Sequence, residues 1–189
     1  PTRNESVVYY DTYVKAEELL RFLESVKEHT PKITLTHLLL RACAMGIHKN
    51  PNMNQYISGD QLYQKEKVEI SFSIKKEKVS KSPLKVLKME MPEKESIQEL
   101  ATRIQERLEV ERSDKKTYTD KEIDYVALLP RFVLKILVKL LRFLDYYNLL
   151  PYSFIKNDPL YASLFIANLG SFGADAGYHH LYEYGTISI

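Results

Sequence analysis

The segment Tyr161–Ala167 (YASLFIA) constrains the fold most, because a short and nearly continuous apolar run is typical of a strand. Segments 68–74 and 83–91 alternate apolar with polar residues and predict strands with one buried face. The β-branched and aromatic segment 6–13 (SVVYYDTY) predicts a further strand. Residues 56–63 predict a hairpin with its turn at Ser58-Gly59-Asp60. The chain is therefore expected to build a sheet.

Apolar residues at helical spacing predict helices between these strands. The expected helices span residues 15–29, about 34–49, 97–108 and 130–147. Thr34 or Thr36 can cap the second helix, and the spacing of Ser96 and Glu99 is that of a capping box for the third. Strands mixed with helices indicate an α/β fold in the form of a two-layer sandwich.

No shift in composition marks a domain boundary, so we expect a single domain over residues 1–189. The chain starts at Pro1 rather than Met and stops within the β-prone run Thr186–Ile189, which suggests a domain incomplete at its C-terminus. The helical stretch at about 120–158 is expected to be an insertion.

The charge balance gives no reason to expect nucleic acid as a partner, because 27 basic and 25 acidic residues leave a formal charge of +2. The only cysteine, Cys43, lies in an apolar run and is expected to be a buried, inert thiol, which suits a reducing cytoplasm. No secretory leader opens the sequence, so a cytoplasmic protein is expected. His37 and His48 are interpreted as packing or capping residues, and no metal site is expected.

The segment Asn168–Gly173 (NLGSFG) follows the apolar run, and its two glycines permit a tight turn. Residues 164–173 (LFIANLGSFG) resemble the "TISNLGSFG" segment of the catalytic domain of 2-oxo acid dehydrogenase acyltransferases, the E2 components related to chloramphenicol acetyltransferase. In the correct order, residues 33–42, 50–54 and 68–74 resemble the family's first core helix, its "P.LN" turn and its "VNIGIAV" strand. No lipoyl-bearing hairpin or small docking domain is visible, so a stand-alone protein is favoured over a dehydrogenase complex.

The resemblance implies the CoA-dependent acyltransferase fold and acyl transfer between CoA and a thiol or hydroxyl acceptor. It implies a homotrimer with active sites at subunit interfaces, with CoA as a substrate and no covalently bound cofactor. In the family, a histidine of a C-terminal HxxxDG motif is the general base, and a serine before NLG stabilises the oxyanion. Asn168, Gly170 and Ser171 are the positions that the resemblance assigns to substrate binding.

The sequence departs from the family at both catalytic positions. Ala167 stands where the family has its serine, and the HxxxDG histidine is expected beyond Ile189, so the chain as it stands is expected to be inactive. The other candidates for catalytic residues are Ser171, His179 and His180. The two histidines lie in a motif (HHLYEYG) that places a tyrosine at the aspartate position. The alternative is a catalytically impaired trimeric scaffold, or a membrane-surface protein, of the same fold.

The expected helix 130–147 is the feature least like the family. It is apolar except for a cationic stripe formed by Arg131, Lys135, Lys139 and Arg142. Each of these charges would cost about 2.5–3.5 kcal/mol near a bilayer centre, which disfavours a spanning helix. The pattern fits an interfacial membrane helix, a lid over an acyl tunnel, or a helix buried against a neighbouring subunit, which is the interpretation we favour.

Overall fold

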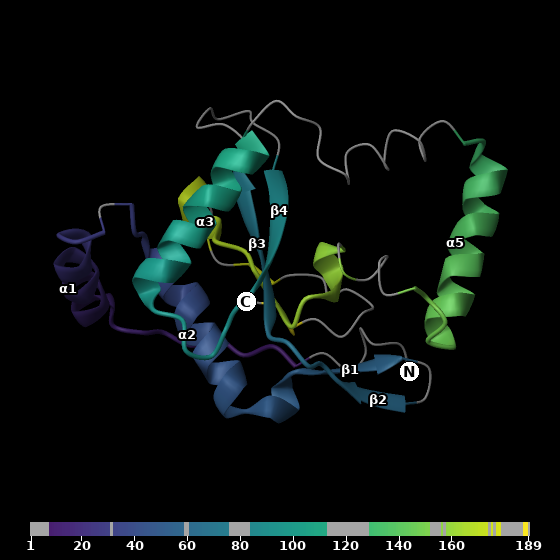
Figure 1. Cartoon of the computed structure of the whole chain (residues 1–189), viewed down its shortest axis with the longest axis horizontal. Coiled ribbons are helices and arrows are strands. Elements are labelled where there is room, and N and C mark those ends of the chain that lie inside the picture. The colour runs from purple at the N-terminus through teal and green to yellow at the C-terminus, as the bar shows by residue number, and fades with distance from the viewer. Residues whose placement is uncertain are drawn as a thin grey trace.

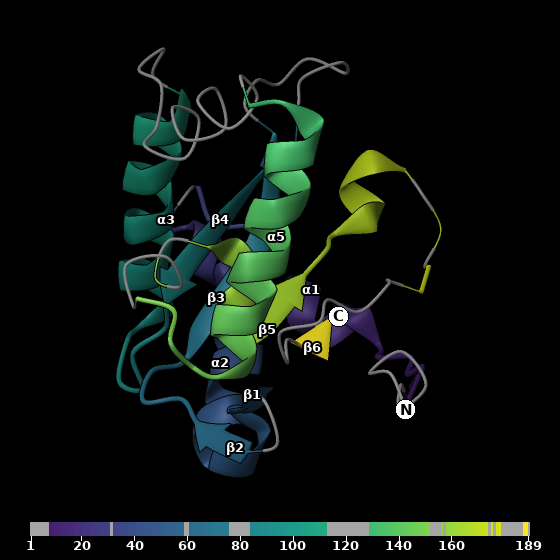
Figure 2. The same ribbon diagram turned by 90° about the vertical axis from the view of Figure 1, so that its right-hand side faces the viewer.

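The computed structural model describes residues 8–30, 32–58, 61–75, 84–112, 129–151, 156, 158–173, 175, 177–178 and 187–188. Figure 1 shows a sheet with helices α2 and α3 on one side and helix α5 on the other. Figure 2, turned by 90°, places α5 in front of the sheet and α3 beyond it. The arrangement confirms the expected α/β fold, in which helices cover a sheet.

The sheet has the strand order β4-β3-β5-β6. The strands are β3 (Glu69–Lys75), β4 (Leu84–Glu90), β5 (Leu164–Ile166) and β6 (Ile187–Ser188). β3 pairs antiparallel with β4 and parallel with β5, and β5 pairs parallel with β6. The strand pattern read from residues 68–74 and 83–91 is therefore confirmed.

Helices α1 (Ala16–Lys27), α2 (Leu35–Lys49) and α3 (Ile97–Arg112) form the layer beside the sheet. Leu40 and Ala44 of α2 and Leu100 of α3 are fully buried in one cluster with Ile70 of β3. A second cluster, which includes Leu23 of α1, joins the three helices to one another. The expected capping box of α3 is present, because the Ser96 backbone N–H donates to the Glu99 carboxylate and the Glu99 N–H donates to Ser96 Oγ.

Two smaller features lie beside this body. A short 3₁₀ turn, η2 (Pro51–Met53), leads into the hairpin of β1 (Gln55–Ser58) and β2 (Gln61–Gln64), as the sequence predicts. Helix α5 (Arg131–Tyr146) ends in a Schellman motif with Asn148 in the left-handed region. The Leu149 N–H donates to the Leu144 carbonyl at 2.8 Å, which closes the helix. No helix in the described part of the chain is both long enough and apolar enough to cross a membrane.

Two predicted strands differ from the structure. Of the predicted strand 6–13, residues 8–13 form no strand, because their side chains are exposed and no face is buried, as Tyr10 and Tyr13 illustrate. Residues 6 and 7 lie outside the described residues. The apolar run from Tyr161 is a strand only over β5, because Asp158 caps a 3₁₀ turn, η3 (Pro159–Tyr161), by accepting from the Leu160 N–H at 2.9 Å. Pro159 favours the first position of such a turn.

Candidate functional site

The turn after β5 is the part of the structure that carries the NLGSFG segment. It begins at the half-buried Ala167 and continues as the 3₁₀ turn η4 (Leu169–Phe172). Gly173 closes the turn with φ of +69°, a backbone conformation that glycine adopts without strain. Gly170 has no positive φ, and a Cβ there would meet only Asn168 Oδ1 at an ordinary 3.6 Å. Of the two glycines, only Gly173 is required by the backbone conformation.

Asn168 anchors this turn to the start of α2. Its side-chain Nδ2 donates to Thr36 Oγ1 at 3.0 Å, and both residues are half-buried. Thr36 is the second residue of α2, so the hydrogen bond fixes the turn against the first turn of that helix. The sequence assigns Asn168 to the site, but nothing in the sequence pattern identifies Thr36 as its partner.

His37 follows Thr36, and its ring belongs to the N-terminal cap of α2. Its Nδ1 accepts a hydrogen bond from the Thr34 backbone N–H at 3.1 Å and lies 2.6 Å from Thr34 Oγ1. Burial lowers the pKa of His37 below its ordinary value, so the ring is neutral near pH 7, with its proton on Nε2. The capping interpretation of His37 is confirmed.

His48 packs on the opposite end of α2. Its Nε2 donates to the Met91 carbonyl at 2.7 Å, which confirms the packing role expected for this residue. Cys43 is half-buried at the edge of the apolar core rather than fully buried as expected, and this partial burial raises the pKa of its thiol. The described residues hold no cluster of three or more His, Cys, Asp or Glu side chains that could bind a metal ion.

Ala167 provides no side-chain hydrogen-bond donor at the position where the family's serine is expected. The two buried serines nearest in the sheet already have partners. Ser71 Oγ donates to the Pro159 carbonyl at 2.6 Å, and Ser163 Oγ accepts from the Glu69 N–H at 3.1 Å. The O–H of Ser71 is thus already used as a donor, which leaves it unable to replace the missing hydroxyl. The Ser171 side chain, His179 and His180 lie outside the described residues.

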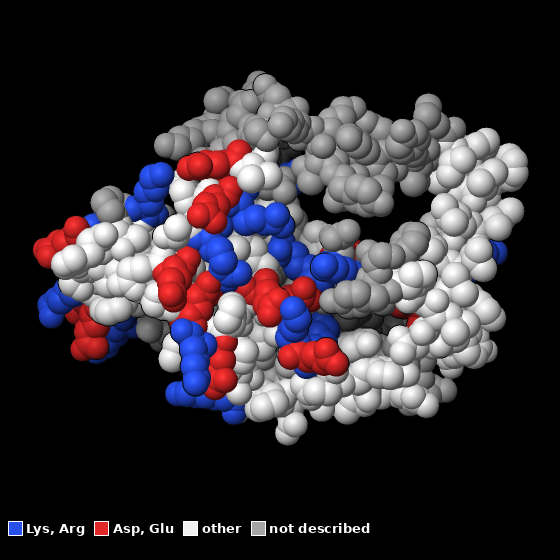
Figure 3. Space-filling model, viewed as in Figure 1, with Lys and Arg blue, Asp and Glu red and all other residues white. Residues whose placement is uncertain are grey.

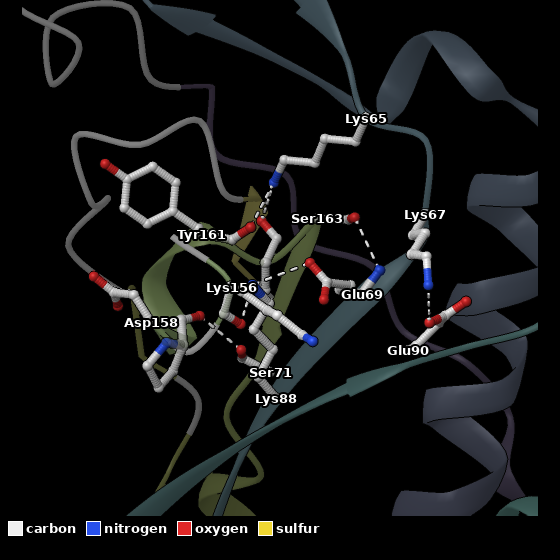
Figure 4. Close-up of polar contacts among 12 residues, drawn as sticks. Lys65, Lys67, Glu69, Ser71, Lys88, Glu90, Lys156, Asp158, Tyr161 and Ser163 are labelled. Carbon is white, nitrogen blue, oxygen red and sulfur yellow. Dashed lines mark hydrogen bonds and ion pairs between the residues drawn. The ribbon is translucent and has the colours of Figure 1, made fainter. Parts of the chain in front are cut away.

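On the sheet face away from α2 and α3, β3 and β4 present the polar side chains of Glu69, Ser71 and Lys88 beside the segment that leads into β5 (Figure 4). Lys88 of β4 forms an ion pair of 3.0 Å with Glu69 of β3, and the Lys88 side chain is only 8% exposed. Lys65 Nζ donates to the backbone carbonyls of Tyr161 and Ala162 at 2.9 and 2.7 Å. The Lys65 bonds hold the segment just before β5 beside the segment that leads into β3. Alternation of polar residues in β3 was the sequence signal for this face.

Comparison with known proteins places the chain in a family. A family model described as "2-oxoacid dehydrogenases acyltransferase (catalytic domain)" matches residues 2–123, more than half of the 189 residues. The chain belongs to this family. The family resemblance is thus confirmed: residues 33–42, 50–54 and 68–74 lie within the match, whereas the NLGSFG segment lies beyond it. A search of curated protein sequences gives no significant match.

Solved structures of the family share the fold of the chain. A probable dihydrolipoamide acetyltransferase of Listeria monocytogenes is 17% identical with a TM-score of 0.56, over 90% of this chain and 56% of its own. The dihydrolipoamide acetyltransferase of Azotobacter vinelandii, studied for the catalytic role of a serine, a histidine and an asparagine, is 22% identical with a TM-score of 0.55, over 88% of this chain and 53% of its own.

The cubic core of a pyruvate dehydrogenase multienzyme complex is 22% identical to the chain, with a TM-score of 0.53 over 88% of this chain and 53% of the core chain. Identities this low establish the fold alone. The chain spans slightly more than half the length of these solved relatives.

Proposed function

We propose that this chain is part of a CoA-dependent acyltransferase that moves an acyl group between CoA and a small thiol or hydroxyl acceptor. The observation that carries the proposal is the match of residues 2–123 to the acyltransferase catalytic domain. CoA enters as a substrate, and no covalently bound cofactor is proposed. We place the protein in the cytoplasm on the ground of its single cysteine, which is a free and half-buried thiol among the described residues.

The proposed reaction is attack of the acceptor on the thioester carbonyl of acyl-CoA. A histidine base from beyond Ile189 removes the acceptor's proton, and the acceptor's sulfur or oxygen forms a bond to the carbonyl carbon. The tetrahedral oxyanion then collapses, the carbon–sulfur bond to CoA breaks, and the departing CoA thiolate takes the proton from the histidine. In the reverse direction the free CoA thiol is the attacking group.

In this proposal, the turn formed by residues 168–171 stabilises the oxyanion. Ala167 has no hydroxyl, and loss of one such donor costs about 3 kcal/mol, a few hundredfold in rate, unless another group replaces it. Backbone N–H groups of the turn are the proposed replacement. The hydrogen bond from Asn168 to Thr36 supports this role because it holds the turn in one position against α2.

A homotrimer with active sites between subunits is the assembly that we propose. It is supported by a structural likeness to the cubic core of the pyruvate dehydrogenase multienzyme complex. The same observation does not require a large complex for this chain, and a stand-alone trimer is the form we propose.

A catalytically impaired scaffold of the same fold is the second candidate, and Ala167 is the observation that favours it. An assay of the complete protein separates the two. It measures CoA formation by chromatography from a panel of acyl-CoA substrates with a dithiol and an alcohol acceptor. An enzyme gives turnover above the uncatalysed rate with at least one acyl chain, whereas a scaffold gives none with any.

The Ala167→Ser variant sharpens this assay. If the turn stabilises an oxyanion, the new hydroxyl should raise turnover by up to a few hundredfold, whereas Ala167→Cys, similar in size but a poor donor, should not. If both variants and the native protein show no turnover, the enzymatic proposal is wrong and the scaffold is supported.

A further inference from the structure

Helix α5 presents three different sides along its length. One side is half-buried and consists of Val133, Leu134, Leu137, Leu141 and Leu144. A second side is open and apolar, and its members are 67%, 63%, 50% and 57% exposed in the order Phe132, Ile136, Leu140 and Phe143. These four residues recur every third or fourth position and form one row, the open row. The open row is therefore a continuous apolar surface without cover from the described chain.

The third side of α5 is cationic and borders the open row. Arg131, Lys135, Lys139 and Arg142 are all exposed. Each of them is the residue directly before a member of the open row, so it lies about 100° round the helix from that member. The helix has a single acidic residue, Asp145, which is half-buried and accepts a hydrogen bond from Tyr161 Oη at 2.7 Å. The solvent side of α5 is thus positive.

We propose that the open row of α5 docks on the surface of an anionic phospholipid bilayer, with the cationic side at the level of the headgroups. Charge complementarity selects this occupant, because a row of lysine and arginine beside an exposed apolar row is what an interfacial helix offers to anionic lipid. The proposal goes beyond the acyltransferase function and needs no catalysis for its test.

The end of α5 supports the same occupant. Tyr146 and Tyr147 are about half exposed, and the Tyr147 ring lies 4.8 Å from that of Phe143 and 5.1 Å from that of Tyr146, centroid to centroid. Aromatic rings with a polar tip favour the boundary between a membrane and water. This cluster therefore continues the open row with residues suited to the depth of the headgroups.

The surface around α5 is also suited to lying on a bilayer. In Figure 3 the charged side chains gather over the helices beside the sheet and over the strands in the centre of the view, whereas the visible surface of α5 and of the β1–β2 hairpin is nearly uncharged. The hairpin exposes Ile57 and Leu62, which are cross-strand partners and are 66% and 62% exposed. Figures 1 and 2 both place this hairpin at one end of α5.

A second copy of the chain is the competing occupant, and it is the one favoured by the sequence pattern alone. Two observations count against it. Symmetric pairing of α5 with α5 would bring two cationic sides together, and lysine is depleted from protein interfaces. In addition, α5 lies outside residues 2–123, which are the residues that the family model matches. The match therefore gives no reason to expect a subunit interface of the family at α5.

Sedimentation with vesicles tests the proposal. The full chain is mixed with vesicles of phosphatidylcholine and phosphatidylserine, or of phosphatidylcholine alone, and the bound fraction is measured at low and high salt. We expect binding to the anionic vesicles that weakens with salt. Ile136→Gln with Leu140→Gln should weaken it at least about 100-fold, and Lys135→Gln with Lys139→Gln roughly 25-fold. All four positions are exposed, so both variants should keep the melting temperature of the native chain.

Matched controls lie on α1, which has exposed apolar and basic residues of its own. Leu20→Gln with Phe22→Gln, and Arg21→Gln with Lys27→Gln, should bind as the native chain does. The proposal is overturned if the native chain does not bind anionic vesicles, or if the α1 variants lose as much binding as the α5 variants. It is also overturned if the native chain does not bind vesicles but forms oligomers in analytical ultracentrifugation and the α5 variants do not. The occupant of the open row is then a second copy of the chain.

Discussion

The side-chain amide of Asn168 and the hydroxyl of Thr36 form a hydrogen bond of 3.0 Å between residues 132 positions apart in the chain. This bond connects the turn after the sheet's β5 strand to the first turn of α2. Through this hydrogen bond the candidate site contacts the helical layer.

Removing either partner should loosen the turn. Asn168→Ala and Thr36→Val should each lower the free energy of unfolding by about 1 kcal/mol, the typical net contribution of one hydrogen bond. The measurement is urea denaturation followed by circular dichroism. The double variant should lose less than the sum of the two single losses, because both remove the same bond. Strict additivity would mean that the pair does not interact in solution.

The buried His37 should make stability depend on pH. Burial lowers the folded-state pKa of His37 below the unfolded value of about 6.5, so the folded state favours the neutral form of the ring. The contribution of His37 is complete above about pH 6.5 and is lost as the pH falls toward the lowered pKa. Urea midpoints at about pH 7.5 and about pH 5.5 should therefore show a decrease at the lower pH.

The control for this prediction is His37→Gln, since glutamine can accept the Thr34 N–H in the same capping position but does not titrate. The variant should lose part of the decrease between the two pH values. An unchanged decrease would show that other groups cause it.

Two lysines that pair with glutamates across β3 and β4 should differ strongly in their effect. Lys88 is nearly buried beside Glu69, whereas Lys67 and its partner Glu90 are about half exposed. Lys88→Met leaves a partly buried carboxylate without its cation and should cost on the order of 2–4 kcal/mol. Lys67→Met should cost about 1 kcal/mol or less in the same denaturation experiment. Equal losses would contradict the burial that the structure gives to Lys88.

The two glycines of NLGSFG should respond differently to a methyl group. Gly173→Ala places a Cβ on a backbone with φ of +69° and should cost about 1–2 kcal/mol, although no atom within 4 Å would clash with it. Gly170→Ala should change the free energy of unfolding by less than about 0.5 kcal/mol, since its backbone has no positive φ. Thermal melts of the two variants give the comparison, and a larger loss at Gly170 would refute it.

Local patterns predicted much of the fold. The Ser96 and Glu99 spacing located the start of α3, and the alternation around Phe72 located β3, because capping and pleating act over only a few residues. The same reasoning misplaced residues 8–13, whose tyrosines look like a strand but are exposed. It also extended the final strand back to Tyr161, although Asp158-Pro159 is a sequence signal for a capped turn.

The candidate site was less accessible to prediction. The motif assigned Asn168 to the site, which stays a prediction, and the bond from Asn168 to Thr36 and the burial of Lys88 depend on contacts between distant segments. For α5 the sequence pattern predicted the cationic side correctly. It could not separate Leu137, which is half-buried, from Ile136, which is open, because both are apolar and only the surrounding chain makes them different.

The parallel pairing of β3 with β5 has a consequence for how the chain folds. Ile70 is aligned with Leu164, so the central pairing of the sheet joins segments on either side of α3 and α5. A ribosome must therefore deliver most of the chain before β3 acquires its second neighbour. Until then one edge of β3 has its backbone groups unpaired, and closure over so long a separation is slow. Nascent chains of this protein are thus expected to depend on chaperones from the synthesis of β3 until β5 has been added.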